Sequence, residues 1–154
     1  MTGASKSLGG FGSLTWANEP PSEEEQFKVK LERSLFRAVY AGDCGQIKSL
    51  LESNRSVLNP NCEGSGRSRP LHIAASRGDI AACRLLVAHG ADFNAVNSLG
   101  FTPLFTAAAN GMGDCVQWLQ SQGVDVRKVS KKGQNAREVA RSFGHPEVER
   151  LIRV

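Results

Sequence analysis

The residues with the most potential for chemistry are three histidines and four cysteines in a chain of 154 residues. Nucleophilic catalysis needs a Cys or Ser within reach of a base that a third group orients. Cys83 and His89 share one predicted helix, but their spacing points the two side chains to different faces. These residues therefore predict no catalytic pair.

Metal and cofactor motifs are also missing from the sequence. No two cysteines have C-x-x-C spacing, and no His lies at zinc-site spacing from another Cys or His. We find no G-x-S-x-G, no P-loop with its Lys, no H-E-x-x-H and no dinucleotide fingerprint. The sequence predicts that the protein is not an enzyme, with no catalytic residue, no cofactor and no metal.

The elements that position these residues recur along the chain. The stretch Arg69–Asp79 returns as Thr102–Met112, shifted by 33 residues, and His89–Asn94 returns as Gln122–Arg127 with the same shift. A fainter copy keeps this phase after Gly133. Upstream, the match has an offset of 36, which a loop rich in Pro, Asn, Gly and Ser can absorb at little cost. We therefore predict four units, at residues 31–66, 67–99, 100–132 and 133–154.

The repeated segment Thr102-Pro-Leu-Phe-Thr-Ala107 and the 33-residue period resemble the ankyrin repeat, whose core reads T-P-L-H-x-A. The resemblance implies an all-α solenoid of about four helix-turn-helix units with short loop or hairpin tips. Thr102 is expected to be an N-cap, with Pro103 at the first helical position. Helices this short are marginal alone in water, so stacking must stabilise them.

Each histidine has a structural explanation within this framework. The resemblance implies that His72 makes a hydrogen bond near a helix start, although Arg69 replaces the Thr that is its usual partner. His89 precedes Gly90 at a helix end, where a partial positive charge is favourable. His145 occupies a place where the family commonly has His.

The N-terminal region has a different composition from the repeats. Residues 1–21 contain four Gly, three Ser and two Pro, which predicts a disordered arm, with the repeat domain at 22–154. Leu8, Phe11, Leu14 and Trp16 interrupt this arm and are interpreted as incidental apolar residues, the alternative being a short partner-binding motif. Ser22–Glu25 resembles a capping box, and the helix that follows either continues into the first repeat or stands apart.

Charge and hydropathy indicate the compartment and the ligands. There is neither a secretion signal nor a run of 18 apolar residues, and free cysteines suit a reducing compartment, so we expect a cytoplasmic or nuclear protein without membrane contact. Residues 127–154 carry eight Lys/Arg against three Asp/Glu. This unit is interpreted as a solvated cap. The alternatives are an acidic surface or nucleic acid, the latter less favoured because no aromatic residues interleave with the lysines.

Partners of ankyrin repeats generally bind the loop tips and the exposed side of each first helix. Carried onto this sequence, the resemblance implies contacts at Tyr40, Ala41, Ser65, Ser68, Ser76, Arg77, Ser98, Leu99, Phe101, Ala109, Asn110, Lys131, Lys132, Gln134, Arg141 and Ser142. Phe101 has two interpretations. It is either an interface hot spot, whose truncation leaves stability nearly intact, or a ring that folds back onto Phe105 and closes the loop.

Asn94 is a candidate for modification. It matches the loop asparagine that cytosolic hydroxylases modify in some ankyrin proteins, and the alternative is a side chain that bonds its own backbone in a turn. The sequence as a whole predicts a non-catalytic module, monomeric when free, that binds a protein partner through its concave groove and loop tips. It would act as an adaptor, a scaffold or a masking inhibitor. The alternative function is association of the basic last unit with nucleic acid or an acidic surface.

Overall fold

The computed structural model describes residues 19–154, and within this range the chain forms α-helices and no strand. The contacts within the chain divide it into two compact parts, Met1–Lys30 and Leu31–Val154, a division distinct from the four predicted repeat units. The helices are α3 (Glu23–Ala41), α4 (Cys44–Ser53), α5 (Pro70–Ser76), α6 (Ile80–Ala88), α7 (Pro103–Ala109), α8 (Gly113–Ser121), α9 (Ala136–Ser142) and α10 (Pro146–Leu151), with a 3-10 turn η1 at Ser65–Arg67. The prediction of an all-α solenoid is confirmed.

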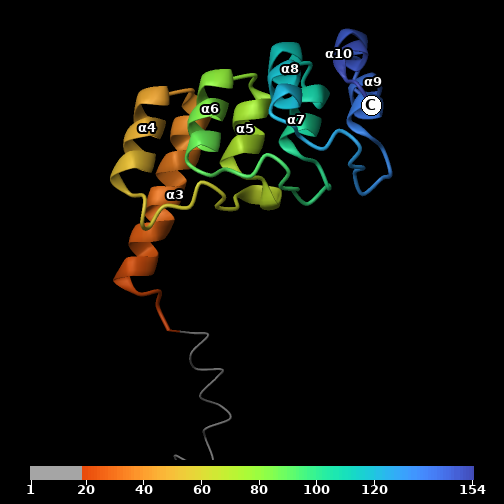
Figure 1. The fold of residues 1–154 in the computed structure, drawn as a ribbon. Coiled ribbons are helices and arrows are strands. Elements are labelled where there is room, and N and C mark those ends of the chain that lie inside the picture. Colours follow the sequence, from red (N-terminus) through yellow and green to blue (C-terminus); the bar gives the residue numbers. More distant parts are fainter. Residues whose placement is uncertain (1–18) are drawn as a thin grey trace, which may run out of the picture. The chain divides into compact units, whose positions relative to one another are not determined.

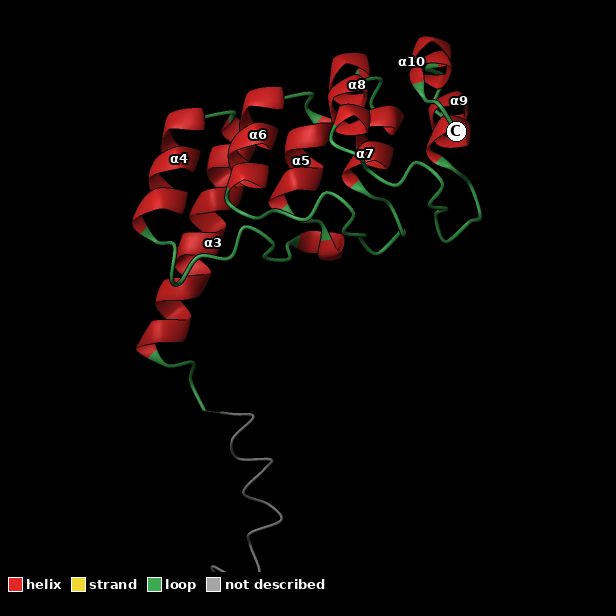
Figure 2. Cartoon of the chain, in the orientation of Figure 1, coloured by secondary structure: helices red, strands yellow, loops and turns green. Residues whose placement is uncertain are grey.

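The helices of Leu31–Val154 follow one another as antiparallel pairs in a row (Figure 1). Helix α5 packs on α6, α7 on α8, and α9 on α10. Between successive pairs, α5 contacts α7 and α7 contacts α9, while α4 contacts α6, α6 contacts α8, and α8 contacts α10. Loops join the pairs along one edge (Figure 2). Each pair thus covers the apolar side of its neighbour, which is how repeat arrays are stabilised.

Small residues make this close stacking feasible. The first helices of the middle units carry consecutive alanines that are fully buried, and the last unit repeats the feature once: Ala74, Ala75, Ala107, Ala108 and Ala140. Larger apolar side chains, among them Leu71, Leu104 and Phe105, fill the space between the helices. Protein interiors are close-packed, so this arrangement is specific to the residue sizes at each position.

Two of the four second helices, α4 and α6, begin with a side-chain cap that the sequence supplies locally. Asp43 accepts a hydrogen bond from the backbone N–H of Gln46 at 2.9 Å, and Asp79 accepts one from Ala82 at 3.0 Å. These bonds satisfy backbone donors that have no partner within the helix. Thr102 stands at the N-cap position of α7, but its hydroxyl makes no capping bond and is buried without a hydrogen-bond partner. The predicted N-cap position of Thr102, with Pro103 as the first helical residue, is thus confirmed, but without a side-chain capping bond.

The start of the described chain resolves one alternative. Ser22 Oγ accepts from the N–H of Glu25 and a Glu25 carboxylate oxygen accepts from the N–H of Ser22, so the predicted capping box is confirmed. One continuous helix, α3, then runs from Glu23 to Ala41. The first 18 residues of the predicted disordered arm, with Leu8, Phe11, Leu14 and Trp16, lie outside the described residues.

Side-chain amides join each unit to the next along the loops. Asn61 Nδ2 donates to the carbonyl of Gly90 at 2.9 Å, and its Oδ1 accepts from the N–H of Asp92 at 2.7 Å. Gln120 repeats this double contact at the last interface, where it donates to the Leu151 carbonyl and accepts from the N–H of Arg153, each at 3.0 Å. Backbone groups that no strand pairs with are thereby satisfied.

Candidate functional site

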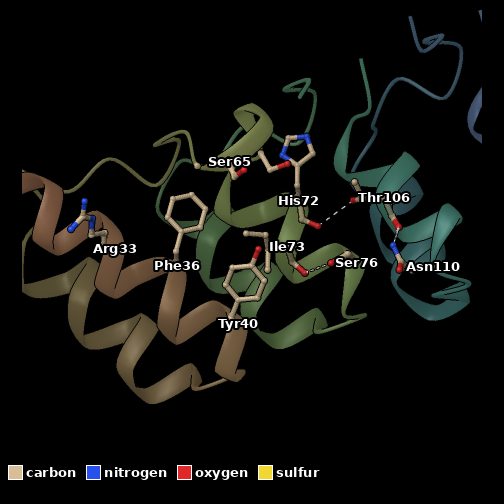
Figure 3. A pocket seen from close by; sticks show the side chains of 11 residues that line it. Arg33, Phe36, Tyr40, Ser65, His72, Ile73, Ser76, Thr106 and Asn110 are labelled. Atoms are coloured by element: carbon tan, nitrogen blue, oxygen red, sulfur yellow. Dashed lines mark hydrogen bonds between the residues drawn. The ribbon is translucent and has the colours of Figure 1, made fainter. Parts of the chain in front are cut away.

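A hollow of about 590 Å³ opens between the first helices of the first three units (Figure 3). One wall belongs to α3 and presents Arg33, Phe36 and Tyr40. Tyr40 is 60% exposed although it is a large aromatic side chain, and Phe36 is half-buried. An exposed and a half-buried aromatic side chain therefore adjoin each other on this wall.

The opposite wall comes from α5 and α7. It consists of His72, Ile73, Ser76, Thr106 and Asn110. Ser76 Oγ donates to the carbonyl of Ile73 at 2.8 Å, and Thr106 Oγ1 donates to the carbonyls of Pro103 at 2.8 Å and His72 at 3.2 Å. Asn110 Nδ2 donates to the carbonyl of Thr106 at 2.7 Å. This wall is polar, and most of its side-chain hydrogen-bond donors already bond to backbone carbonyls of α5 and α7.

The loop before α5 closes the hollow at one end through Gly64, Ser65 and Ser68. Phe36 lies directly beneath Gly64, since a Cβ added to that glycine would lie 2.8 Å from the ring atom Cζ. The N–H of Gly64 donates to the carbonyl of Ser68 at 2.8 Å, which folds the loop back on itself. A side chain at Gly64 would require the Phe36 ring to shift.

His72 links this site to the next unit. Its Nδ1 accepts from the N–H of Arg69 at 3.2 Å, and its Nε2–H donates to the carbonyl of Phe101 at 2.9 Å. Burial is the main cause that lowers the pKa of His72 below its ordinary value of 6.5, so the ring is neutral near pH 7. The backbone N–H of Arg69 thus takes the part expected of a Thr side chain, and the structural role implied for His72 is confirmed.

The structure brings together five of the predicted contact residues. The hollow is lined by Tyr40, Ser65, Ser68, Ser76 and Asn110, which come from three successive units. Arg77 follows Ser76 at the C-terminal end of α5 and is exposed, with its guanidinium beside the turn at Gly42. The concave row expected from the repeat phase is therefore present in the first three units, and its contact with a partner stays a prediction.

Of the other predicted contact residues, Ala41 ends α3 and Ala109 ends α7, and the rest lie at the loop tips or on the last unit. The N–H of Ser98 donates to the Gly66 carbonyl at 2.8 Å, and the N–H of Lys131 donates to the Leu99 carbonyl at 3.1 Å, so the tips form a ladder. Leu99, Lys131 and Lys132 are exposed. Gln134 bonds Ser142, and Arg141 bonds Glu149 of α10. These residues do not reach the hollow.

The geometry of Phe101 agrees with the second interpretation, in which its ring folds back onto Phe105. Its ring stacks on that of Phe105, with the centroids 5.4 Å apart and an interplanar angle of 23°. The Phe101 N–H donates to Asn97 Oδ1 at 3.0 Å, and the ring packs against the core. Part of the ring is still exposed. Contact of Phe101 with a partner stays a prediction, but the residue also closes its loop.

Asn94 does not use its side chain within its own turn, as the alternative interpretation expected. Its Oδ1 accepts from the N–H of Asp125 in the next unit at 3.1 Å, while Asp92 accepts from the N–H of Asn94 at 2.9 Å. The Nζ of Lys128 donates to the Asn94 carbonyl at 2.8 Å. Hydroxylation of Asn94 stays a prediction, for which peptide mass measurement on protein from its native cell would look for one added oxygen.

Several residues of the site were missed in the sequence. Phe36, Arg33, Ile73 and Thr106 line the hollow, yet none was among the predicted contacts. Phe143 does not line the hollow, but it is 58% exposed and follows Asn110 by the 33-residue period. The period itself is the signal that finds Phe143. It also pairs Ile73 with Thr106, whereas Phe36 and Arg33 depend on how the neighbouring loop folds.

Most of the groups that first suggested chemistry are buried or structural, and Cys44 is partly exposed. Hydrogen bonding with Cys115 and burial raise the pKa of the Cys83 thiol, and burial followed by nearby Asp79 and Asp43 raises the pKa of Cys44. A raised pKa disfavours the nucleophilic thiolate. Across residues 19–154 no three His, Cys, Asp or Glu side chains cluster as metal ligands. None of the helices in that range combines the length and apolar character needed to cross a membrane.

Comparisons with known proteins agree with this architecture. The family model for Ankyrin repeats (3 copies) matches residues 35–130. Ankyrin repeat domain-containing protein 37 of Mus musculus is 40% identical over 108 residues, covering 69% of this chain and 65% of that protein. The Homo sapiens protein of the same name is 36% identical over 110 residues, with 69% and 66% covered. Ankyrin repeat and SAM domain-containing protein 6 of Rattus norvegicus is 30% identical over 136 residues, 88% of this chain and 15% of the rat protein.

The fold, the repeated hydrogen bonds and these matches define one class, a helical repeat solenoid. The chain belongs to the ankyrin repeat family. It spans 65% of the length of the mouse relative and 66% of the human one, which is less than two thirds of either. Ankyrin repeats generally mediate protein–protein interaction, and proteins of this family are generally non-catalytic.

Proposed function

We propose that this chain is a non-catalytic module that binds a protein partner through the hollow lined by Tyr40, Ser68 and Asn110, with the loop tips adding contacts. The observation that carries the proposal is the exposed aromatic wall of α3, where Tyr40 is 60% exposed beside Phe36. The module would act as an adaptor, a scaffold or a masking inhibitor in the cytosol or nucleus, and would be monomeric when free.

The size and chemistry of the site suit a protein better than a small molecule. Pockets for small ligands enclose most of their ligand, whereas this hollow is open and polar on one side. An interface that extends from it over the tips at Leu99 and Lys131 would be near the standard size, on the order of 1,600 Å² in total. Aromatic side chains at the centre of such an interface carry a large share of the binding energy.

The experiment compares two exposed side chains. Wild type, Tyr40→Ala and Val129→Ala are immobilised, and proteins retained from a native-cell extract are identified and then remeasured with purified components. Val129 is the matched control, because it is 59% exposed but lies away from the hollow. We expect Tyr40→Ala to weaken binding of the purified partner tenfold or more, the scale of a hot spot, and Val129→Ala to leave it unchanged. Equal affinity for all three proteins would refute this use of the hollow.

A second candidate function uses the charge of the last unit. Two of its three acidic residues are engaged internally, since Glu138 accepts from the N–H of Asn135 and Glu149 pairs with Arg137 and Arg141. Lys131 and Lys132 therefore lie on a surface with an excess of positive charge. Binding to nucleic acid would fall steeply with salt and would be abolished by Lys131→Glu with Lys132→Glu. A partner bound through the hollow would lose only the contribution of the tip at Lys131 and would keep most of its affinity.

A further inference from the structure

The hollow has a specific polarity as well as an apolar wall. Resting on the proposed function, we infer that it selects an extended, acidic segment of a partner protein that carries one apolar side chain. The apolar side chain would lie against Phe36, Tyr40 and Ile73. A carboxylate would lie beside Arg33, and backbone N–H groups of the segment would face α5 and α7.

The charge around the hollow determines the sign of the ligand. Arg33 is the one formally charged side chain among the described residues that line it, and no carboxylate lines it. Glu63, in the loop that closes the hollow, is engaged with Arg67 at 3.2 Å and with Arg69 at 3.6 Å. His72 is buried and neutral. A carboxylate on the partner would therefore meet an attractive field at the α3 wall, and a Lys or Arg there would be repelled.

The hydrogen-bond inventory determines what the other wall recognises. A hydroxyl has one hydrogen and two lone pairs. Ser76 gives its hydrogen to the Ile73 carbonyl, and Thr106 shares its own between two helix carbonyls. Their oxygens and the side-chain oxygen of Asn110 are left as three acceptors toward the hollow, against one unused N–H of the Asn110 amide. This wall thus matches a ligand that donates hydrogen bonds.

An extended segment supplies such donors better than a helix. In an α-helix, all N–H groups beyond the first turn bond within the helix, so few reach a partner. An extended segment keeps its N–H groups free and alternates its side chains, which places one toward the wall of Phe36 and Tyr40 while its neighbours point away. An apolar residue flanked by Asp or Glu fits the three features of the hollow together.

The test selects ligands without knowledge of the partner. A display library of random linear peptides is selected on the folded full chain, and the peptides that bind are counter-screened on Tyr40→Ala. Tyr40-dependent peptides are then synthesised, and their affinities are measured by fluorescence anisotropy. We expect an apolar residue next to Asp or Glu in these peptides and a loss of affinity of tenfold or more on Tyr40→Ala.

A pair of charge reversals on one helix tests the sign. Arg33→Glu should weaken these peptides about fivefold, because an exposed attraction becomes a repulsion. Arg37→Glu is the matched control: Arg37 is equally an exposed arginine of α3 but lines a separate hollow with Gln46 and Leu50. We expect it to leave affinity unchanged, apart from a small effect of net charge that salt removes.

The outcomes separate this inference from the proposed function. Tyr40-dependent peptides rich in Lys or Arg, or peptides that respond equally to the two reversals, would overturn the acidic ligand and leave the hollow as a binding site. Peptides that bind only as helices would do the same for the extended conformation. A selection without any Tyr40-dependent peptide would overturn both.

Discussion

Two aromatic pairs in the array have opposite environments. Phe101 and Phe105 stack on each other at 5.4 Å in the third unit, and Phe105 is fully buried. Phe36 and Tyr40 lie on the first helix of the first unit, where Tyr40 is mostly exposed and Phe36 is half-buried beside a hollow. Phe36 and Phe105 occupy the same position in the repeat. An offset of 36 residues separates the first unit from the second, and an offset of 33 separates the second from the third. Equal positions in the repeat therefore do not give equal burial.

The difference lies in what covers each ring. Phe105 is enclosed by the helices of adjacent units and by Phe101 from its own loop. Phe36 is covered only in part, by the backbone at Gly64 in a loop that is three residues longer than its counterpart. The lengthened loop thus leaves the Phe36 ring partly exposed, and this is the surface that we propose binds a partner.

Phe105→Ala should give the largest effect, because it removes a large, fully buried side chain from the stacked pair of Phe101 and Phe105. We expect the free energy of unfolding to fall by about 3–5 kcal/mol, the range for a buried Phe replaced by Ala. Urea denaturation followed by far-UV circular dichroism measures it. A loss below about 1 kcal/mol would mean that this region can collapse around the cavity and is not sealed.

Phe101→Ala sharpens the comparison within the same pair. The ring is partly exposed and stacked, so its removal should lower the free energy of unfolding by about 1–2 kcal/mol. This differs from the expectation drawn from sequence, in which stability is nearly intact. The same denaturation experiment decides between them, and an affinity measured per folded molecule separates the structural role from partner contact. Unchanged stability with tenfold weaker binding would restore the hot-spot interpretation.

Much of the fold could be predicted because each unit is specified locally. The Pro residues at helix starts and the Asp caps each act within one unit, and the 33-residue period repeats this pattern from unit to unit. The helices follow the pattern. The same phase identified Tyr40, Ser68 and Asn110, which the structure brings to one hollow. It could also have identified Phe143, since that residue needs no information beyond the period.

The remaining features depend on contacts between units, which no local pattern encodes. Asn94 bonds Asp125, 31 residues away, instead of its own turn. The ring of Phe36 depends on the path of a loop around Gly64. Thr102 has the residue type of an N-cap, but burial between units leaves its hydroxyl without a partner. None of these three features follows from the residues that adjoin it in the sequence.

His72 lines the hollow and bonds the carbonyl of Phe101 in the neighbouring loop. This buried histidine should make stability depend on pH. The pKa of His72 is lowered in the folded state, so the unfolded chain binds its proton more readily. Stability from this group is therefore fully present above pH 6.5 and is lost as the pH falls through the lower folded value. The slope cannot exceed about 1.4 kcal/mol per pH unit for one proton.

Histidine ring resonances, measured by NMR from about pH 7.5 to about pH 5, check this directly. This range brackets the ordinary His pKa of 6.5. The carboxyl groups Glu63 and Glu149 do not interfere, because their pKa values are lowered from an ordinary 4.5. Protonation of His72 at or above pH 6.5 would contradict the buried neutral ring. It would also remove the reason for Nδ1 to accept from Arg69.

Tyr40→Ala should have the smallest effect on stability, which is the other half of the comparison. The side chain is 60% exposed, so its loss should change the free energy of unfolding by less than about 0.5 kcal/mol. Paired with Phe105→Ala, it separates two uses of an aromatic residue on a first helix: one stabilises the array, and the other remains available to a ligand. A cost above about 1.5 kcal/mol for Tyr40→Ala would place this ring in the core, and the α3 wall could then not be a free binding surface.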